Sequence, residues 1–146
     1  MLHDERPENF KGDNQTVVIG IFFDNERRIL TLQSAEKSLY EFVKTEAVGG
    51  ESIYDALTRA AFDKAKIILD PFTPPSFRTW YVEQEDKSFI LHLTWIHFSP
   101  RPNVEIDKKN YSDFRWLLLN DVLSNHLDED THKCIQQTKK NAMSVH

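Results

Sequence analysis

The sequence predicts an α/β fold in which helices cover both faces of a β-sheet. Segments 16–23, 28–34 and 77–84 are rich in β-branched and aromatic residues, as strands are. Between them, residues 52–67 carry apolar side chains at the spacing of one face of a helix. Segment 88–99 has apolar side chains on both faces, which is the pattern of a central strand with helices above and below it.

The first two strands are expected to form a hairpin. Residues 16–23 read TVVIGIFF, residues 24–26 interrupt this run with polar turn formers, and residues 28–34 resume a strand pattern. A further short strand is expected at 40–42, before the helix.

The helix expected over residues 52–67 has one apolar side and one charged side. Its apolar residues recur at i, i+3, i+4, i+7, i+8 and i+14, and they are Ile53, Ala56, Leu57, Ala60, Ala61 and Ile67. On the other side Asp55, Arg59 and Asp63 follow one another at i, i+4 spacing, so Arg59 can form ion pairs within the helix. Lys64 and Lys66 lie near its C-terminal end, where the helix dipole favours cations.

Two long strands and a polar tail are expected after this helix. The prolines of segment 71–75 exclude regular structure there, because they lack amide donors. Residues 85–87 then separate the strands 77–84 and 88–99. From Asp121 onward the chain reads as a short helix, an acidic break at 128–130 and a polar helix to about Ala142.

Composition limits the classes of function. The net charge of −5 argues against a nucleic-acid binder that works by neutralising phosphates. Residues 1–15 are charged from the fourth position and lack an apolar core, so we expect a flexible arm, not a signal peptide or membrane anchor, before a single domain over 16–146. The single cysteine, Cys134, cannot form an internal disulfide, which favours a cytoplasmic protein.

The loop and the helix that contain Gly50, Glu51 and Arg59 have the residue spacing of a known catalytic motif. Gly50 and Glu51 are followed eight residues after the glutamate by Arg59. This stretch resembles the Nudix box, G-x5-E-x7-R-E-U-x-E-E-x-G-U with U aliphatic, of the nucleoside-diphosphate-linked hydrolases. The resemblance implies an α/β/α sandwich with a mixed sheet. It places Thr45 at the leading glycine, and Ala60, Asp63 and Lys64 at the three glutamates that follow the arginine.

The resemblance also implies that the metal chemistry is degraded. In the family those glutamates hold divalent cations that bridge the substrate's diphosphate, and Mg²⁺ needs oxygen ligands. The five charged letters of an intact box sum to −3, whereas Glu51, Arg59, Asp63, Lys64 and Lys66 sum to +1. A unit charge misplaced at roughly 4 Å is worth at most about 4 kcal/mol at an effective dielectric of 20, enough to abolish a weak ion site.

A second segment resembles the family and departs from it in the same direction. Residues 110–122 resemble the late E-H-x-x-x-x-W strand, and Trp116 matches its tryptophan. Asn110 and Tyr111 take the places of the glutamate and the histidine. The glutamate of that pattern often assists the metal or the water, so a second source of catalytic chemistry is predicted to be lost.

These observations predict a catalytically impaired Nudix-fold domain that acts as a ligand-binding or interaction module. Glu51, Arg59 and Asp63 are the remnant of the catalytic box, and Asp63 is alternatively a salt-bridge partner. The candidate ligand-binding residues, for a nucleotide- or diphosphate-type molecule, are Lys44, Lys64, Lys66, Phe77 and Trp80. A protein partner or a homodimer is the other possibility.

Two enzymatic alternatives stay open. A divergent hydrolase would hold Mg²⁺ or Mn²⁺ with Asp63, or with Glu46 in place of a missing carboxylate. Without such a metal no inorganic cofactor is implied. The remaining alternative is an enzyme of another class that performs metal-free acid–base chemistry on a diphosphate or terpenoid-like substrate, with Asp63 or Glu46 as the acid.

Overall fold

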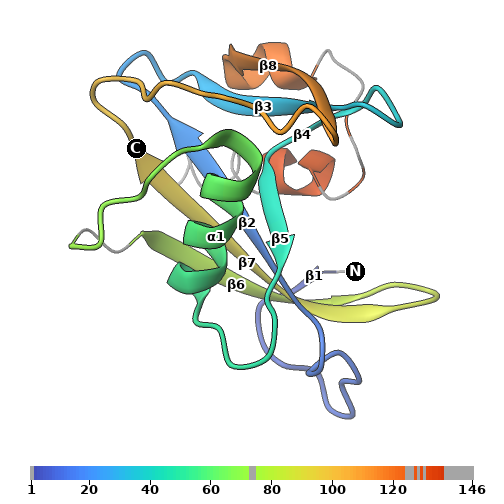
Figure 1. Ribbon diagram of the computed structural model, residues 1–146. Helices are drawn as coiled ribbons and strands as arrows, with labels where there is room; N and C mark the ends of the chain where they lie inside the picture. The colour runs from blue at the N-terminus through green and yellow to red at the C-terminus, as the bar shows by residue number, and fades with distance from the viewer. Residues whose placement is uncertain (1, 73–74, 124–126, 128, 130, 137–146) are drawn as a thin grey trace.

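The protein is built on one mixed β-sheet with helices on its faces (Figure 1). The computed structural model describes residues 2–72, 75–123, 127, 129 and 131–136. The sheet has eight strands in the order β1-β6-β7-β2-β3-β4, with β5 paired to β2 and β8 paired to β3. The elements are β1 Leu2–His3, β2 Thr16–Phe23, β3 Ile29–Ser34, β4 Tyr40–Glu41, β5 Val43–Glu46, α1 Ile53–Ala65, β6 Ser76–Glu83, β7 Ser88–His97, β8 Tyr111–Leu117 and α2 Leu119–Leu123.

Strand β2 lies in the middle of the sheet. It pairs in parallel with β7 over its whole length, from Thr16 opposite Ile90 to Phe23 opposite His97. Its other edge is antiparallel to β5, while the expected hairpin partner β3 meets β2 only at Phe23 and Ile29. The predicted hairpin is therefore limited to its turn, and β3 runs on between β8 and β4.

The two faces of the sheet are covered by separate apolar clusters, so the predicted α/β fold with a mixed sheet is confirmed. On one face Ala56, Leu57, Ala60, Ala61 and Ala65 of α1 pack on residues of β2, β3 and β5. On the other face the cover comes from α2 and from the helical residues 131–136, whose buried side chains include Val122, Cys134 and Ile135. The predicted continuation of that helix to Ala142 lies outside the described residues.

Helix α1 begins and ends where its sequence provides caps. Ser52 is the N-cap, and its hydroxyl accepts a hydrogen bond from the Asp55 amide at 3.0 Å. Lys66 ends the helix in the left-handed conformation, with φ of 56°, and its amide bonds back to the last turn. The helix predicted over 52–67 is thus confirmed, and Asp63 and Lys64 lie in its last turn. Among the described residues no helix has the length and apolar character needed to cross a membrane.

The N-terminal segment differs from the predicted flexible arm. Leu2 and His3 form β1, which pairs antiparallel with Val82 and Tyr81 of β6. Phe10 is buried, and its ring packs edge-on against that of Tyr81 with the centroids 5.4 Å apart. Leu2 also packs against the apolar cluster on the sheet face opposite α1, so the segment lies against the sheet. Leu2 and Phe10 are isolated apolar residues in a charged stretch, which is why the composition of residues 1–15 does not predict this packing.

Candidate functional site

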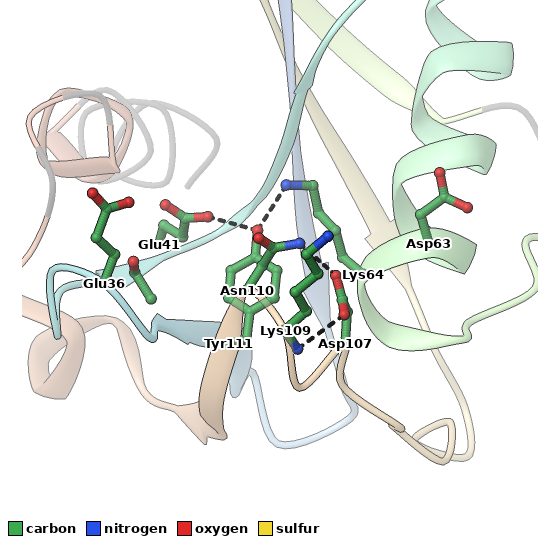
Figure 2. Close-up of a pocket in the computed structure, with 9 residues that line it drawn as sticks. Glu36, Glu41, Asp63, Lys64, Asp107, Lys109, Asn110 and Tyr111 are labelled. Atoms are coloured by element: carbon green, nitrogen blue, oxygen red, sulfur yellow. Dashed lines mark hydrogen bonds between the residues drawn. The ribbon is translucent and has the colours of Figure 1, made fainter.

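A pocket of about 620 Å³ opens at the C-terminal end of α1. Its walls come from the end of β3, from β4, from the last turn of α1 and from the loop that leads into β8 (Figure 2). The volume is that of sites for small ligands. The lining residues are Ser34, Glu36, Glu41, Asp63, Lys64, Asp107, Lys109, Asn110 and Tyr111.

A chain of two hydrogen bonds crosses this pocket from helix to sheet. Lys64 Nζ donates to the hydroxyl of Tyr111 at 2.7 Å, and that hydroxyl donates to Glu41 Oε1 at 2.8 Å. Figure 2 shows the lysine side chain reaching from α1 toward the Tyr111 hydroxyl, with Glu41 on its far side. The ammonium also lies 5.2 Å from the centroid of the Tyr111 ring. Lys64 stands where the resemblance to the Nudix box puts a metal-binding glutamate.

The surroundings of Lys64 make it easier to deprotonate than an ordinary lysine. Burial is the main cause that lowers the pKa of its ammonium, and the positive charges of Lys44 and Arg59 act in the same direction. The carboxylates of Glu41 and Asp107 oppose the shift without reversing it. The net effect is a pKa below the usual value of 10.5.

Two of the pocket's four carboxylates, those of Glu41 and Asp107, accept hydrogen bonds from neighbouring groups. Asp107 accepts hydrogen bonds from Asn110 Nδ2 at 2.6 Å and from the Lys109 amide at 3.1 Å, and these bonds lower the pKa of its carboxyl. Glu41 accepts from Tyr111. Across the described part of the chain, no three His, Cys, Asp or Glu side chains are grouped so as to hold a metal ion. A divalent cation of the kind that the resemblance implies would need several such oxygen ligands.

The sign of the pocket's charge differs from that of the box alone. Four carboxylates line it, from Glu36, Glu41, Asp63 and Asp107, against the two ammonium groups of Lys64 and Lys109. The formal sum is −2, whereas the box residues counted in the sequence sum to +1. Three of the four carboxylates lie outside the motif, and no local pattern in the sequence connects them with it.

Glu51 and Arg59, the best preserved letters of the box, do not line the pocket. Arg59 binds both carboxylate oxygens of Glu51, with Nε and Nη2 each at 3.0 Å, and this contact lowers the pKa of the Glu51 carboxyl. Arg59 Nη2 also donates to the carbonyl of Glu46 at 2.9 Å. Their place in the structure is the junction between β5 and α1.

The other predicted site residues lie at varying distances from the pocket. The Lys66 ammonium stands over the ring of Phe62, 4.5 Å from its centroid, and Lys44 is close enough to affect Lys64 electrostatically without lining the cavity. The Glu46 side chain is exposed outside the lining.

The two predicted aromatic contacts also lie outside the pocket lining. Phe77 is 56% exposed on β6. Trp80 is 2% exposed and packs in the cluster on the sheet face opposite α1. Trp80 is therefore a core residue and not a wall of this pocket.

Comparison with known proteins identifies the fold of this chain. No family model matches the chain, and no curated protein matches it. Among solved structures it is similar to a MutT protein from Methanosarcina mazei Go1, with TM-score 0.68 and 12% identity over 87% of this chain and 93% of that one. It is similar also to the NUDIX domain of Shewanella oneidensis NrtR complexed with ADP ribose, with TM-score 0.68 and 18% identity over 95% and 94%.

A third similar structure is a C. elegans Ap4A hydrolase, with TM-score 0.65 and 14% identity over 88% of this chain and 98% of that one. These likenesses extend over nearly the whole length of each chain, so they describe the entire fold and not one motif. At such low sequence identities, these structural similarities are evidence for the fold alone. The chain has the Nudix hydrolase fold.

Proposed function

We propose that this chain is a catalytically impaired Nudix-fold domain that binds a nucleotide- or diphosphate-type ligand in the pocket around Lys64. One observation carries the proposal. The Lys64 ammonium, hydrogen-bonded to Tyr111, occupies the box position of a metal-binding glutamate. An ammonium supplies positive charge to a phosphate, but it cannot deliver a metal-bound water for hydrolysis.

The mixed charge of the pocket favours a ligand that carries both acceptors and donors. Lys64 and Lys109 suit phosphate oxygens, while Glu36 and Asp63 suit hydroxyl groups of a sugar. A ligand of phosphate groups alone, such as pyrophosphate, would face four carboxylates. A nucleoside diphosphate sugar combines both kinds of group. The similar NrtR domain was crystallised with ADP ribose, which makes that compound the first probe.

The second candidate function is that of a divergent hydrolase. It is favoured by the excess of carboxylates in the pocket, with Asp63 on α1 as the remnant metal ligand. In that case cleavage of a nucleoside diphosphate-linked compound would require Mg²⁺ or Mn²⁺ and would disappear in Asp63→Asn.

Calorimetry and product analysis together distinguish the ligand-binding domain from the divergent hydrolase. We expect ADP ribose to bind the protein in EDTA, and Lys64→Met to weaken this binding roughly tenfold, equivalent to about 1.4 kcal/mol. Lys66→Gln is the matched control, because its ammonium lies over Phe62 outside the pocket, and we expect it to bind as the wild type does. Binding that needs Mg²⁺, or chromatography that shows metal-dependent products from a nucleotide panel, would overturn the proposal.

A further inference from the structure

We infer that the ligand of this pocket carries a primary amine close to its phosphate groups, as a nucleoside diphosphate ester of a short amino alcohol does. The inference rests on the proposed function and names the part of the ligand beyond the diphosphate. It is carried by two opposite charges, those of Lys64 and Glu41, which the hydroxyl of Tyr111 holds in fixed places in the pocket.

Tyr111 fixes the positions of both charged groups. It is only 4% exposed, its hydroxyl accepts a hydrogen bond from Lys64 Nζ at 2.7 Å, and the same hydroxyl donates to Glu41 Oε1 at 2.8 Å. This direction of bonding favours the charged ammonium and the charged carboxylate, because each ion is bonded to a hydroxyl that the other ion polarises. Figure 2 shows Lys64 and Glu41 on opposite sides of that hydroxyl. The pocket therefore presents a cation and an anion that one hydroxyl group separates.

Both charged groups keep hydrogen-bonding capacity for a ligand. An ammonium has three N–H donors, and Tyr111 takes one of those of Lys64. A carboxylate accepts at two oxygens, and the bond from Tyr111 goes to Oε1 of Glu41. A ligand phosphate can thus accept from Lys64 while a ligand amine donates to Glu41. Because only one hydroxyl separates the two protein groups, a short aliphatic linker must join the phosphate and the amine of the ligand.

A second carboxylate lies on the same side of the pocket as Glu41. Figure 2 shows Glu36 and Glu41 on the side away from α1, whereas Asp63 belongs to α1 itself. Glu36 is exposed, and within the described residues no hydrogen bond or ion pair engages its carboxylate. It is therefore available to a ligand amine that is bonded to Glu41.

The charge of the pocket favours an amine over a hydroxyl group at this place. The two charges of a diphosphate diester match the ammonium groups of Lys64 and Lys109, and no other lining residue is a lysine or an arginine to compensate the four carboxylates. A ligand hydroxyl donates one hydrogen bond to a carboxylate. A primary ammonium donates up to three and also supplies a positive charge.

The lining also distinguishes a primary amine from a quaternary one. Quaternary ammonium groups are recognised by aromatic rings that surround them. Among the described residues that line the pocket Tyr111 alone is aromatic, and its ring centroid already lies 5.2 Å from the Lys64 ammonium. A trimethylammonium group would also bring no N–H donor to Glu36 and Glu41. We therefore expect N-methylation of the ligand to weaken its binding.

The test is calorimetry in EDTA with the cytidine diphosphate esters of ethanolamine, glycerol and choline. We expect the ethanolamine ester to bind roughly fivefold more tightly than either of the other two, and this ratio to shrink at high salt. Equal or weaker binding of the ethanolamine ester would overturn the inference. If the glycerol ester and ADP ribose bind in that case, the proposed function stands without it, whereas a failure of all these nucleotides to bind would remove both.

Four variants locate the two parts of the site. Glu36→Gln and Glu41→Gln should each bring the affinities of the ethanolamine and glycerol esters closer together, and Glu36 is exposed and unpaired within the described residues, so its variant should fold as the wild type does. Glu85→Gln is the matched control, because Glu85 is exposed in the turn between β6 and β7 and does not line the pocket, and it should keep the wild-type ratio. An unchanged ratio in both of the other glutamine variants would overturn the inference.

Lys64→Met tests the phosphate side of the same site. It should weaken the binding of all three esters alike, because it removes a contact that they share. Tighter binding of the ethanolamine ester to Lys64→Met would identify the pocket as a site for simple cations and would overturn the inference.

Discussion

Arg59 binds Glu51 through two parallel hydrogen bonds, each 3.0 Å long, across the junction between β5 and α1. Glu51 Oε1 also accepts the Val48 amide at 2.8 Å, and Arg59 Nη2 donates to the Glu46 carbonyl at 2.9 Å. The pair therefore fixes both ends of the connection that leads into the helix. The contact between Arg59 and Glu51 has a structural role that does not require a metal ion.

The first prediction concerns this pair. Arg59→Met removes three hydrogen bonds at the junction, so we expect a lower thermal midpoint and faster hydrogen exchange at the Val48 amide. Mass-spectrometric exchange of a peptide spanning 46–52 reports the second effect. Glu46→Gln is the control, because only the backbone carbonyl of Glu46 contacts Arg59. Equal exchange in Arg59→Met and in the wild type would show that the pair does not hold the loop.

The second prediction concerns the packed N-terminal segment. A Cβ added at Gly12 would lie 2.5 Å from the Phe89 nitrogen and 2.6 Å from the Ser88 carbonyl carbon, and this backbone cannot move aside cheaply. We expect Gly12→Ala to lower the free energy of unfolding in urea by about 1–3 kcal/mol. At Gly49 an added Cβ meets nothing within 4 Å, so Gly49→Ala should stay within about 0.5 kcal/mol of the wild type. Equal stability of the two variants would mean that residues 1–15 do not pack on the sheet in solution.

The regular elements were predictable because their signals are local. The spacing of Ile53, Ala56, Leu57, Ala60 and Ala61 defines the buried side of α1, and all but Ile53 are fully buried. The run of residues 16–23 coincides with β2. The pairing of β3 was not predictable in the same way, because the edge of β2 is taken by β5, a partner that arrives from later in the chain.

The pocket was predictable only where it coincides with a motif. Lys64, Asp63 and Tyr111 were identified because they stand at positions where the two Nudix sequence patterns have a glutamate or a histidine. Glu41 of β4 and Asp107, in a loop more than sixty residues further along the chain, are brought to the pocket by the tertiary structure. No motif in the sequence around either residue identifies it as part of a site. Trp80, which was predicted as a ligand contact, lies in the apolar cluster on the sheet face opposite α1. A strand that alternates aromatic and polar side chains does not reveal which of its faces borders a ligand.

The third prediction separates Trp80 from Phe77. Trp80→Ala should cost about 3–5 kcal/mol of stability in urea unfolding, because its 2% exposed side chain fills the core. Phe77→Ala, on the same strand but 56% exposed, should change stability by no more than about 0.5 kcal/mol. A Trp80→Ala protein of normal stability that failed to bind ADP ribose would instead place Trp80 in the ligand site.

A buried carboxylate at the β2–β3 turn is the basis of the last prediction. Asp24 Oδ1 accepts the amides of Glu26 and Arg28, both at 2.9 Å, and Oδ2 accepts Arg101 Nη2 at 2.6 Å and Nε at 3.0 Å. The Arg101 guanidinium also lies 4.9 Å from the Trp116 ring centroid. Burial by itself would raise the pKa of Asp24, but the bonds from Arg101 and from the two amides outweigh it and the pKa is lowered.

Because the folded protein holds the Asp24 proton less tightly than the unfolded chain does, this carboxylate stabilises the fold above the unfolded pKa of about 3.9. The contribution is lost as the pH falls through the lowered folded value. Asp24→Asn keeps an acceptor for the amides but turns an NH₂ group toward Arg101, so we expect a cost of about 1–3 kcal/mol at pH 7. Urea unfolding between pH 7 and pH 3 should show this difference shrinking below pH 4. Asp113→Asn, which loses only an exposed 3.5 Å contact with Arg115, is the control and should match the wild type throughout. A difference that stayed constant down to pH 3 would show that the Asp24 charge does not stabilise the turn.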